Sequence, residues 1–291
     1  MDITRRRIAL AGVAALVGAV VAGSCSPLHT FNAVMPKDSG SARVGTAQFG
    51  PLPRQELDIY APKPAPTGAL PVIVFIYGGS WNSGDKGGYS FVGRALAARG
   101  FVVVIPDYRL VPQVHYPAFV QDNAAAVHWV RQHVRDYGGD PSRLVLMGHS
   151  AGAYNAAMLA YDPRWLGADR VAVRGFIGLA GPYDFLPFAG PDVEAAFAGV
   201  SDPAATQPVN HASADAPPAL LATADKDTLV RPQNSDAMDK ALTAHGVAVT
   251  RVRYPGIGHV GLITSVAKPL RGHAPVLDDA VRFAARVTAQ H

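Results

Sequence analysis

Continuous apolar runs alternate with helix-like stretches along most of this chain. Residues 72–77 (VIVFIY), 101–108 (FVVVIPDY) and 143–148 (RLVLMG) contain runs of the kind that is buried on both faces of a sheet. The stretches 91–99 and 117–137 have helical periodicity, and glycines follow both. This alternation has no repeat period. It predicts an α/β fold in which one doubly wound, mostly parallel sheet carries helices on both faces.

The other predicted elements continue the same order. They are strands at 54–60, 173–181, 217–225 and 247–254 and helices at 153–161, 233–245 and 276–288. The connection 182–216 is too long for an ordinary loop and carries a short predicted helix near 193–197. We expect it to be a small lid-like insertion or pocket wall. At 291 residues the chain suits one large domain, here over 46–291.

The first 25 residues have the pattern of a targeting segment. Arg5–Arg7 precede about sixteen apolar residues (IALAGVAALVGAVVAG), a run that is short for a membrane span and long enough for a signal peptide. The arginine pair also resembles a twin-arginine export signal. An uncleaved membrane anchor is the alternative. We expect residues 1–25 to be a signal peptide, residues 26–45 a linker or N-terminal arm, and the protein to be exported to the periplasm or cell envelope.

Cys25 is the only cysteine, which excludes an intramolecular disulfide and a cysteine-based metal site. Its context, AGSC, resembles a bacterial lipoprotein signal, with Ala22 where a larger aliphatic residue is usual. Cys25 is therefore a candidate for lipid attachment to a membrane, and ordinary cleavage nearby is the alternative. The sequence contains no H-x-H, H-E-x-x-H or calcium-loop pattern, so we expect no metal ion, and no cofactor is required.

The net charge of +4 does not indicate a nucleic-acid partner. Arg5–Arg7 and Asp2 together supply two of these positive charges, which leaves +2 for the rest of the chain. Elsewhere the lysines and arginines neither cluster nor alternate with aromatic residues. A nucleic-acid interface needs such a basic patch, so we expect no nucleic-acid binding.

The strongest local signal is the segment RLVLMGHSAGAYNAAM. Its residues 148–152 match G-x-S-x-G, with a predicted buried strand directly before and a predicted helix directly after. The small residues permit a tight turn that exposes the Ser150 hydroxyl, and the following helix N-terminus directs N–H groups to the same place. Ser150 is therefore the candidate nucleophile.

A serine hydroxyl needs a base, and the base needs a carboxylate that orients it. With this strand–serine–helix turn the chain order is serine, acid, histidine. Among the later histidines, His259 lies in a glycine-flanked loop (YPGIGHVG) just past the last predicted strand, which makes it the candidate base. The preceding strand ends near two acids. We prefer Asp227, in a D-x-x-V pattern, and expect Asp225 to hold the turn.

Six segments together resemble the α/β-hydrolase superfamily, and among its branches the esterases and lipases with an H-G-G-x-W loop. That branch includes carboxylesterases and arylformamidases. The resemblance runs from about residue 54 to the C-terminus and rests on IYGGSW, PDYRLVP, YPAFVQDNAAAVHWV, GHSAG, PPALLATADKDTLV and GIGHVG. It implies an α/β-hydrolase fold for the catalytic domain at 46–291.

In those relatives, the loop after the third strand supplies N–H groups to an oxyanion hole. Carried over to this chain, the donors are the backbone N–H groups of Gly79 and Ser80, with Ala151 as the third. Tyr77 stands where the family usually has histidine. We expect Tyr77 either to brace the loop in a different way or to line the pocket.

Other residues are weaker candidates for substrate contacts. They include Trp81, His149 and Asp184. Trp81 alternatively packs beneath the oxyanion loop, and Asp184 alternatively caps the lid. Residues 107–109 (DYR) are expected to form a structural hydrogen-bond cluster at a strand end.

Together these residues predict a serine carboxylic ester hydrolase that acts on small or short-acyl esters through an acyl-enzyme. Ser150 attacks, His259 takes its proton, and Asp227 orients the imidazole. The expected partner is a small-molecule ester. Two alternatives remain: an arylformamidase-type amide hydrolase with the same triad, and a non-catalytic envelope-binding protein on a hydrolase scaffold.

Overall fold

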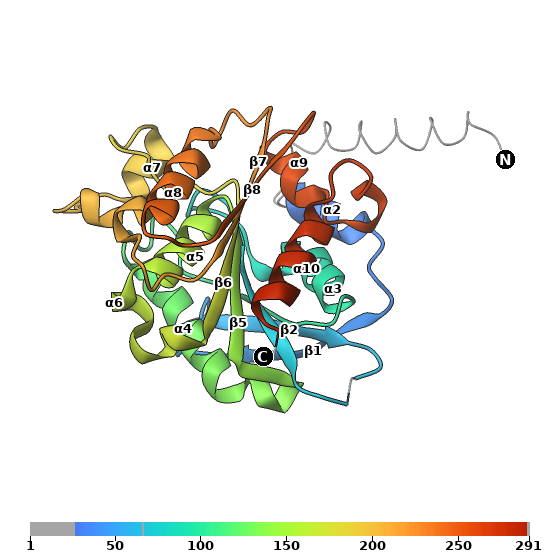
Figure 1. Ribbon diagram of the computed structural model, residues 1–291. Helices are drawn as coiled ribbons and strands as arrows, with labels where there is room; N and C mark the ends of the chain where they lie inside the picture. Colours follow the sequence, from blue (N-terminus) through green and yellow to red (C-terminus); the bar gives the residue numbers. More distant parts are fainter. Residues whose placement is uncertain (1–26, 66, 290–291) are drawn as a thin grey trace.

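The computed structural model describes residues 27–65 and 67–289, which form an eight-stranded sheet with helices on both sides (Figure 1). The strand order is β1-β2-β4-β3-β5-β6-β7-β8. The β1–β2 and β2–β4 pairs are antiparallel, and the remaining pairs are parallel. The predicted fold class is confirmed. The strands are β1 Ser41–Gln48, β2 Glu56–Pro62, β3 Leu70–Ile76, β4 Val102–Pro106, β5 Gly139–His149, β6 Val173–Leu179, β7 Ala219–Ala224 and β8 Val249–Tyr254.

Two groups of helices cover the sheet. Helices α4, α5 and α8 lie against one face, and α3 and α10 lie against the other (Figure 1). The helices with described bounds are α2 Pro27–Val34, α3 Ser90–Ala97, α4 Ala118–His133, α5 Ala151–Tyr161, α6 Pro163–Leu166, α7 Pro191–Ala196, α8 Gln233–Ala244, α9 His259–Thr264 and α10 Val276–Val287.

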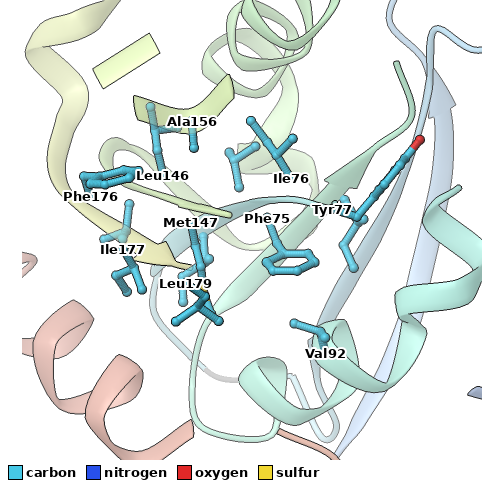
Figure 2. Packing of buried hydrophobic residues seen from close by; sticks show 14 of the residues in the cluster. Phe75, Ile76, Tyr77, Val92, Leu146, Met147, Ala156, Phe176, Ile177 and Leu179 are labelled. Atoms are coloured by element: carbon cyan, nitrogen blue, oxygen red, sulfur yellow. The ribbon is translucent and has the colours of Figure 1, made fainter. Parts of the chain in front are cut away.

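The central strands are buried on both faces, as their continuous apolar runs predict. The side chains of Val72–Ile76 in β3 have no exposed surface. Figure 2 shows Phe75 on the side of Val92 from α3, whereas Ile76 lies on the side of Ala156 from α5. Successive strand residues point to opposite faces, so an apolar residue is needed at every position.

The parallel strands end at one edge of the sheet, and the loops that follow them meet there. In sheets of this kind, ligands bind beyond the carboxyl ends of the strands. The loops that converge at this edge span 77–84, 149–150, 180–190, 225–232 and 255–258. They contain Ser150 and Asp227, and the candidate base His259 begins the helix α9 that directly follows the last of them.

The N-terminal part of the described chain differs from expectation. The sequence predicts a linker over 26–45, but α2 begins at Pro27 and β1 begins at Ser41. Helix α2 has only eight residues, and its position depends on contacts with distant residues that no local pattern reveals. Strand β1 is an edge strand with mostly partly exposed or exposed side chains, so it lacks an apolar run.

The predicted signal peptide and Cys25 lie outside the described residues. Over 27–65 and 67–289, no helix combines the length and apolar character that crossing a membrane requires.

Candidate active site

Ser150 lies at the turn between β5 and α5, in a conformation that non-glycine residues rarely adopt. Its φ is 55° and its ψ is −127°. The Ser150 N–H donates a hydrogen bond to Leu179 O at 2.9 Å, and Ser150 O accepts one from the Ala153 N–H at 2.9 Å. Such strain persists only where the surrounding structure imposes it, and it is common at active sites. The sharp turn that G-x-S-x-G predicts is therefore present.

Three glycines allow the backbones around Ser150 to come into contact. A Cβ atom at Gly148 would lie 2.3 Å from Gly152 O, and one at Gly152 would lie 2.1 Å from Ile76 O. A Cβ atom at Gly78 would lie 2.8 Å from the Ser150 Cβ. These distances are too short for any side chain. The glycines are required because the end of β3, the turn at Ser150 and the first turn of α5 touch one another.

His259 is the first residue of α9, and its ring contacts Asp227. The Nδ1 atom of His259 lies 2.7 Å from Asp227 Oδ2. The other carboxylate oxygen, Oδ1, accepts hydrogen bonds from the N–H groups of Leu229 at 3.0 Å and Val230 at 2.9 Å. The Asp227 side chain has no exposed surface, and the His259 side chain is 9% exposed. The carboxylate is thus fixed by three donors.

Burial alone would raise the pKa of the Asp227 carboxyl, but the hydrogen bonds from His259 and the two backbone N–H groups outweigh it and lower the pKa below its usual value. The carboxylate is therefore ionised at neutral pH and holds the proton of His259 on Nδ1, which leaves Nε2 free to accept another. Asp225, the alternative acid, accepts a hydrogen bond from the Gly256 N–H at 2.8 Å and holds the turn.

One cavity of about 1120 Å³ brings the predicted site residues together. Ser150 and His259 line it, together with Gly79, Ser80 and Ala151. Its volume lies just above the range of about 300–1,000 Å³ that is usual for pockets that bind small molecules. The candidate nucleophile, the candidate base and the predicted oxyanion donors therefore share one space.

The loop after β3 has an unusual backbone. Gly79, Ser80 and Trp81 all have positive φ angles, of 134°, 49° and 59°. The N–H groups of Asn82 and Ser83 both donate to Gly79 O at 3.0 Å and close the loop. Among the described residues, no acceptor binds the N–H group of Gly79 or Ser80. These two donors are available to a ligand in the cavity.

Tyr77 does not line this cavity, and the structure therefore corrects its prediction as a substrate contact. Its side chain is fully buried and its ring stacks between Tyr108, at 4.8 Å, and Tyr89, at 5.3 Å. The Tyr77 hydroxyl donates to Asp107 Oδ1 at 2.8 Å and accepts from Arg54 at 2.8 Å. The other expectation, that Tyr77 braces the oxyanion loop, agrees with this position.

Arg54 and Tyr108 complete a polar network beneath the loop. Arg54 also donates to Gly84 O and to Tyr108 O, each at 2.7 Å, and the Tyr108 hydroxyl donates to Tyr77 O at 2.9 Å. Asp107 accepts a further hydrogen bond from the Lys86 N–H at 2.7 Å. Burial raises the pKa of both the Asp107 carboxyl and the Tyr77 hydroxyl. The network thus holds both ends of the loop, residues 77 and 84.

Trp81 is buried at the cavity wall, and its role as a substrate contact stays a prediction. It lines the cavity, and its indole N–H donates to Asn155 Oδ1 at 3.0 Å. Asn155 in turn donates to Asn123 Oδ1 at 2.8 Å. The Trp81 ring makes an edge contact with Phe197 of the 182–216 segment at 5.2 Å. Sequence reasoning missed Asn155, although a buried asparagine inside an apolar helix is a sign of such a partner.

His149 is buried at the cavity wall and contacts His259. Its Nε2 lies 3.2 Å from His259 O, and the two rings are 4.8 Å apart. Burial, and then the nearby charge of His259, lower the pKa of His149 to about 3. The ring is therefore neutral at physiological pH, and its N–H supports the backbone of His259.

Asp184 is exposed and does not line the cavity, so its prediction as a substrate contact is not supported. The N–H groups of Tyr183 and Asp184 instead bind Asn234 Oδ1 at 2.8 and 3.0 Å. The segment 182–216 does contribute a wall, through residues such as Phe185 and Val193. A second wall comes from α2, which the sequence did not predict to be near the site.

Among the described residues, no group of three or more histidine, cysteine, aspartate or glutamate side chains is arranged to hold a metal ion. The expectation that no metal is used stays a prediction.

The sheet and the strained serine turn define an α/β-hydrolase. The chain belongs to the BD-FAE family, whose model matches residues 57–242. The predicted resemblance to the esterase branch of the superfamily is confirmed.

Named relatives are esterases. The chain is 31% identical over 261 residues to isoprenylcysteine alpha-carbonyl methylesterase ICME from Arabidopsis thaliana, covering 79% of this chain and 59% of that protein. It is 31% identical over 212 residues to carboxylesterase NlhH from Mycobacterium tuberculosis, covering 65% of this chain and 66% of that protein. The chain spans between a quarter and two thirds of the length of the curated relatives that it matches.

Solved structures agree with the fold. A thermostable esterase from Pseudomonas putida superposes with a TM-score of 0.72 at 27% identity, covering 95% of this chain and 96% of that one. Esterase B from Lactobacillus rhamnosis superposes with a TM-score of 0.76 at 21% identity, covering 98% and 96%. The second match shows similarity of fold alone.

The Tyr77 network generates a stability prediction. Tyr77→Phe removes one hydroxyl and leaves buried Asp107 and half-buried Arg54 each short of a partner, which costs about 1–3 kcal/mol in free energy of unfolding. Tyr137→Phe is the matched control, because the partly exposed Tyr137 hydroxyl makes no hydrogen bond with the other described residues. Urea unfolding of both variants measures the difference. Equal stabilities would contradict the role of Tyr77 as a brace.

Proposed function

We propose that this chain is a serine ester hydrolase that acts on small esters through a covalent acyl-enzyme. The observation that supports it best is one cavity lined by a strained serine, by a histidine bound to a buried carboxylate, and by unoccupied N–H groups. The family and the esterase relatives support the same reaction class.

In the proposed mechanism, the Ser150 oxygen attacks the ester carbonyl carbon while His259 Nε2 takes the hydroxyl proton. Ionised Asp227 stabilises the imidazolium that results. The carbonyl oxygen becomes an oxyanion that accepts hydrogen bonds from the N–H groups of Gly79, Ser80 and Ala151. Each such donor is typically worth about 100- to 1,000-fold in rate, since it meets charge that appears only in the transition state.

The rest of the cycle first releases the alcohol and then hydrolyses the acyl-enzyme with water. His259 gives its proton to the ester oxygen, the bond to the alcohol breaks, and the acyl group remains on Ser150. His259 then takes a proton from water while the water oxygen attacks the acyl carbon. As the bond between the acyl carbon and the Ser150 oxygen breaks, His259 returns this proton to Ser150 and the acid is released. The neutral state of buried His149 suits this cycle, because a second positive charge beside His259 would oppose its protonation.

Removing the nucleophile tests this proposal. Ser150→Ala should lower kcat for p-nitrophenyl acetate by roughly a million-fold, because triad residues act as a unit. Ser201→Ala is the matched control, since Ser201 is exposed and does not line the cavity. Near-wild-type hydrolysis by Ser150→Ala would refute the mechanism. Preference for N-formylkynurenine over all esters would favour an arylformamidase, and no turnover by the wild type would favour a binding protein.

We further propose that the chain is exported and that Cys25 attaches it to a membrane. The support is sequence alone: the arginines, the apolar run and the AGSC context. Helix α2 starts two residues after Cys25 and packs on the domain, so attachment there would hold the domain close to the membrane surface.

Fractionation tests this second proposal. Cys25→Ser should move the protein from the membrane fraction to the soluble extracytoplasmic fraction, because the only thiol that can carry a lipid is gone. The wild-type chain expressed in parallel is the control. Persistence of the variant in the membrane fraction would favour an uncleaved anchor, and a cytoplasmic location of the wild type would exclude export.

A further inference from the structure

The cavity extends away from Ser150 between two helices that the sequence does not connect. Helices α2 and α9 lie close together beside the carboxyl ends of the strands (Figure 1). Both helices line the cavity, and the apolar lining residues of α2, of Met35 directly after it and of α9 are Leu28, Phe31, Val34, Met35, Val260 and Ile263. We call this part of the cavity the apolar trough. It begins at the candidate base, because His259 is the first residue of α9.

Specific contacts fix the α2 wall in place. Asn32 Nδ2 donates to Gly87 O at 2.8 Å, and Asn32 Oδ1 accepts from the Ser90 hydroxyl at 2.9 Å and the Phe91 N–H at 3.1 Å. The Phe31 ring packs edge-on against Phe91 at 5.3 Å. The wall is therefore held by a satisfied side-chain network, which defines the orientation of its apolar residues.

Large apolar side chains that are exposed to solvent gather around this cavity. Seven large apolar side chains are exposed among the described residues, and three of them line this cavity. They are Val34 at 62%, Leu229 at 74% and Val260 at 58% exposure. A cluster of this kind marks a binding surface rather than the scattered exposure that is normal.

The charge of the lining points to an uncharged occupant. Within the described part of the chain, no lysine or arginine lines the cavity, and its one carboxylate is Asp192 of α7. Asp192 accepts a hydrogen bond from Asn82 at 2.9 Å, so it already has a partner. Beyond His259, the polar lining residues on the side of the trough are Thr30, Thr264 and His273.

We propose that the apolar trough binds an extended apolar group of the ester substrate, so that the enzyme acts on esters with a medium or long hydrocarbon chain as well as on small ones. This proposal rests on the proposed ester hydrolase function. The reacting carbonyl lies at Ser150, and the chain runs past His259 between α2 and α9. The apolar group belongs to either the acyl or the alcohol side of the ester, and the experiment has one arm for each.

Two substrate series test the trough. The first is p-nitrophenyl esters from acetate to dodecanoate, and the second is acetate esters of alcohols from ethanol to dodecanol. In one series kcat/KM should rise with length, by up to about fourfold per methylene, the fold-change that burying one CH₂ group gives. If kcat/KM stayed flat or fell with chain length in both series while acetate was still hydrolysed, the proposed role of the trough would be contradicted and the ester hydrolase function would stand. No hydrolysis of any ester would overturn both.

A matched pair of variants tests whether the dependence of kcat/KM on chain length arises in the trough. Val34→Glu places a charge in the trough and should lower the ratio of long-chain to acetate kcat/KM at least about tenfold. Val171→Glu is the same change at a residue that is 73% exposed and outside the cavity, and it should keep the wild-type ratio. Val34→Ser, a milder change, should shift the ratio in the same direction. An unchanged ratio in folded Val34→Glu or Val34→Ser would contradict the proposal.

Discussion

The contact between the end of β3 and the first turn of α5 determines the geometry of the whole site. A Cβ atom at Gly152 would lie 2.1 Å from Ile76 O and 2.3 Å from Tyr77 O, so only glycine allows this approach. The approach brings the loop after β3 opposite Ser150. Both halves of the proposed chemistry, the nucleophile and its oxyanion donors, therefore depend on the same backbone contact.

The loop that this contact positions has three successive positive φ angles and needs support from below. The support is the network that joins buried Tyr77 and Asp107 to half-buried Arg54. A tyrosine reaches farther than a histidine, and its hydroxyl both donates and accepts, so one side chain links a carboxylate and a guanidinium. Stacking between Tyr108 and Tyr89 fixes the ring. The backbone of the loop is strained where it faces the cavity, and the polar groups beneath it have hydrogen-bond partners where it meets the core.

The sequence predicted what depends on local pattern and chain order. Buried parallel strands are continuous apolar runs, and the triad order then selected Ser150, Asp227 and His259. In the structure Ser150 and His259 line one cavity, and His259 contacts buried Asp227. The sequence did not predict α2, because an eight-residue helix of this kind is held in place by distant partners. The sequence left the roles of Tyr77 and Asp184 open, because loop conformation sets the direction of both side chains. Site residues at strand ends are thus readable from sequence, whereas a pocket wall such as α2, which depends on distant contacts, is not.

The central claim is that Ser150 is a nucleophile activated by His259. Reaction with a fluorophosphonate probe, followed by peptide mapping with mass spectrometry, tests it most directly, because the probe bonds only to an activated hydroxyl in such a site. The account predicts one adduct on Ser150 in the wild type and little or none in His259→Ala. An adduct on another residue, or undiminished labelling of Ser150 without His259, would contradict the account.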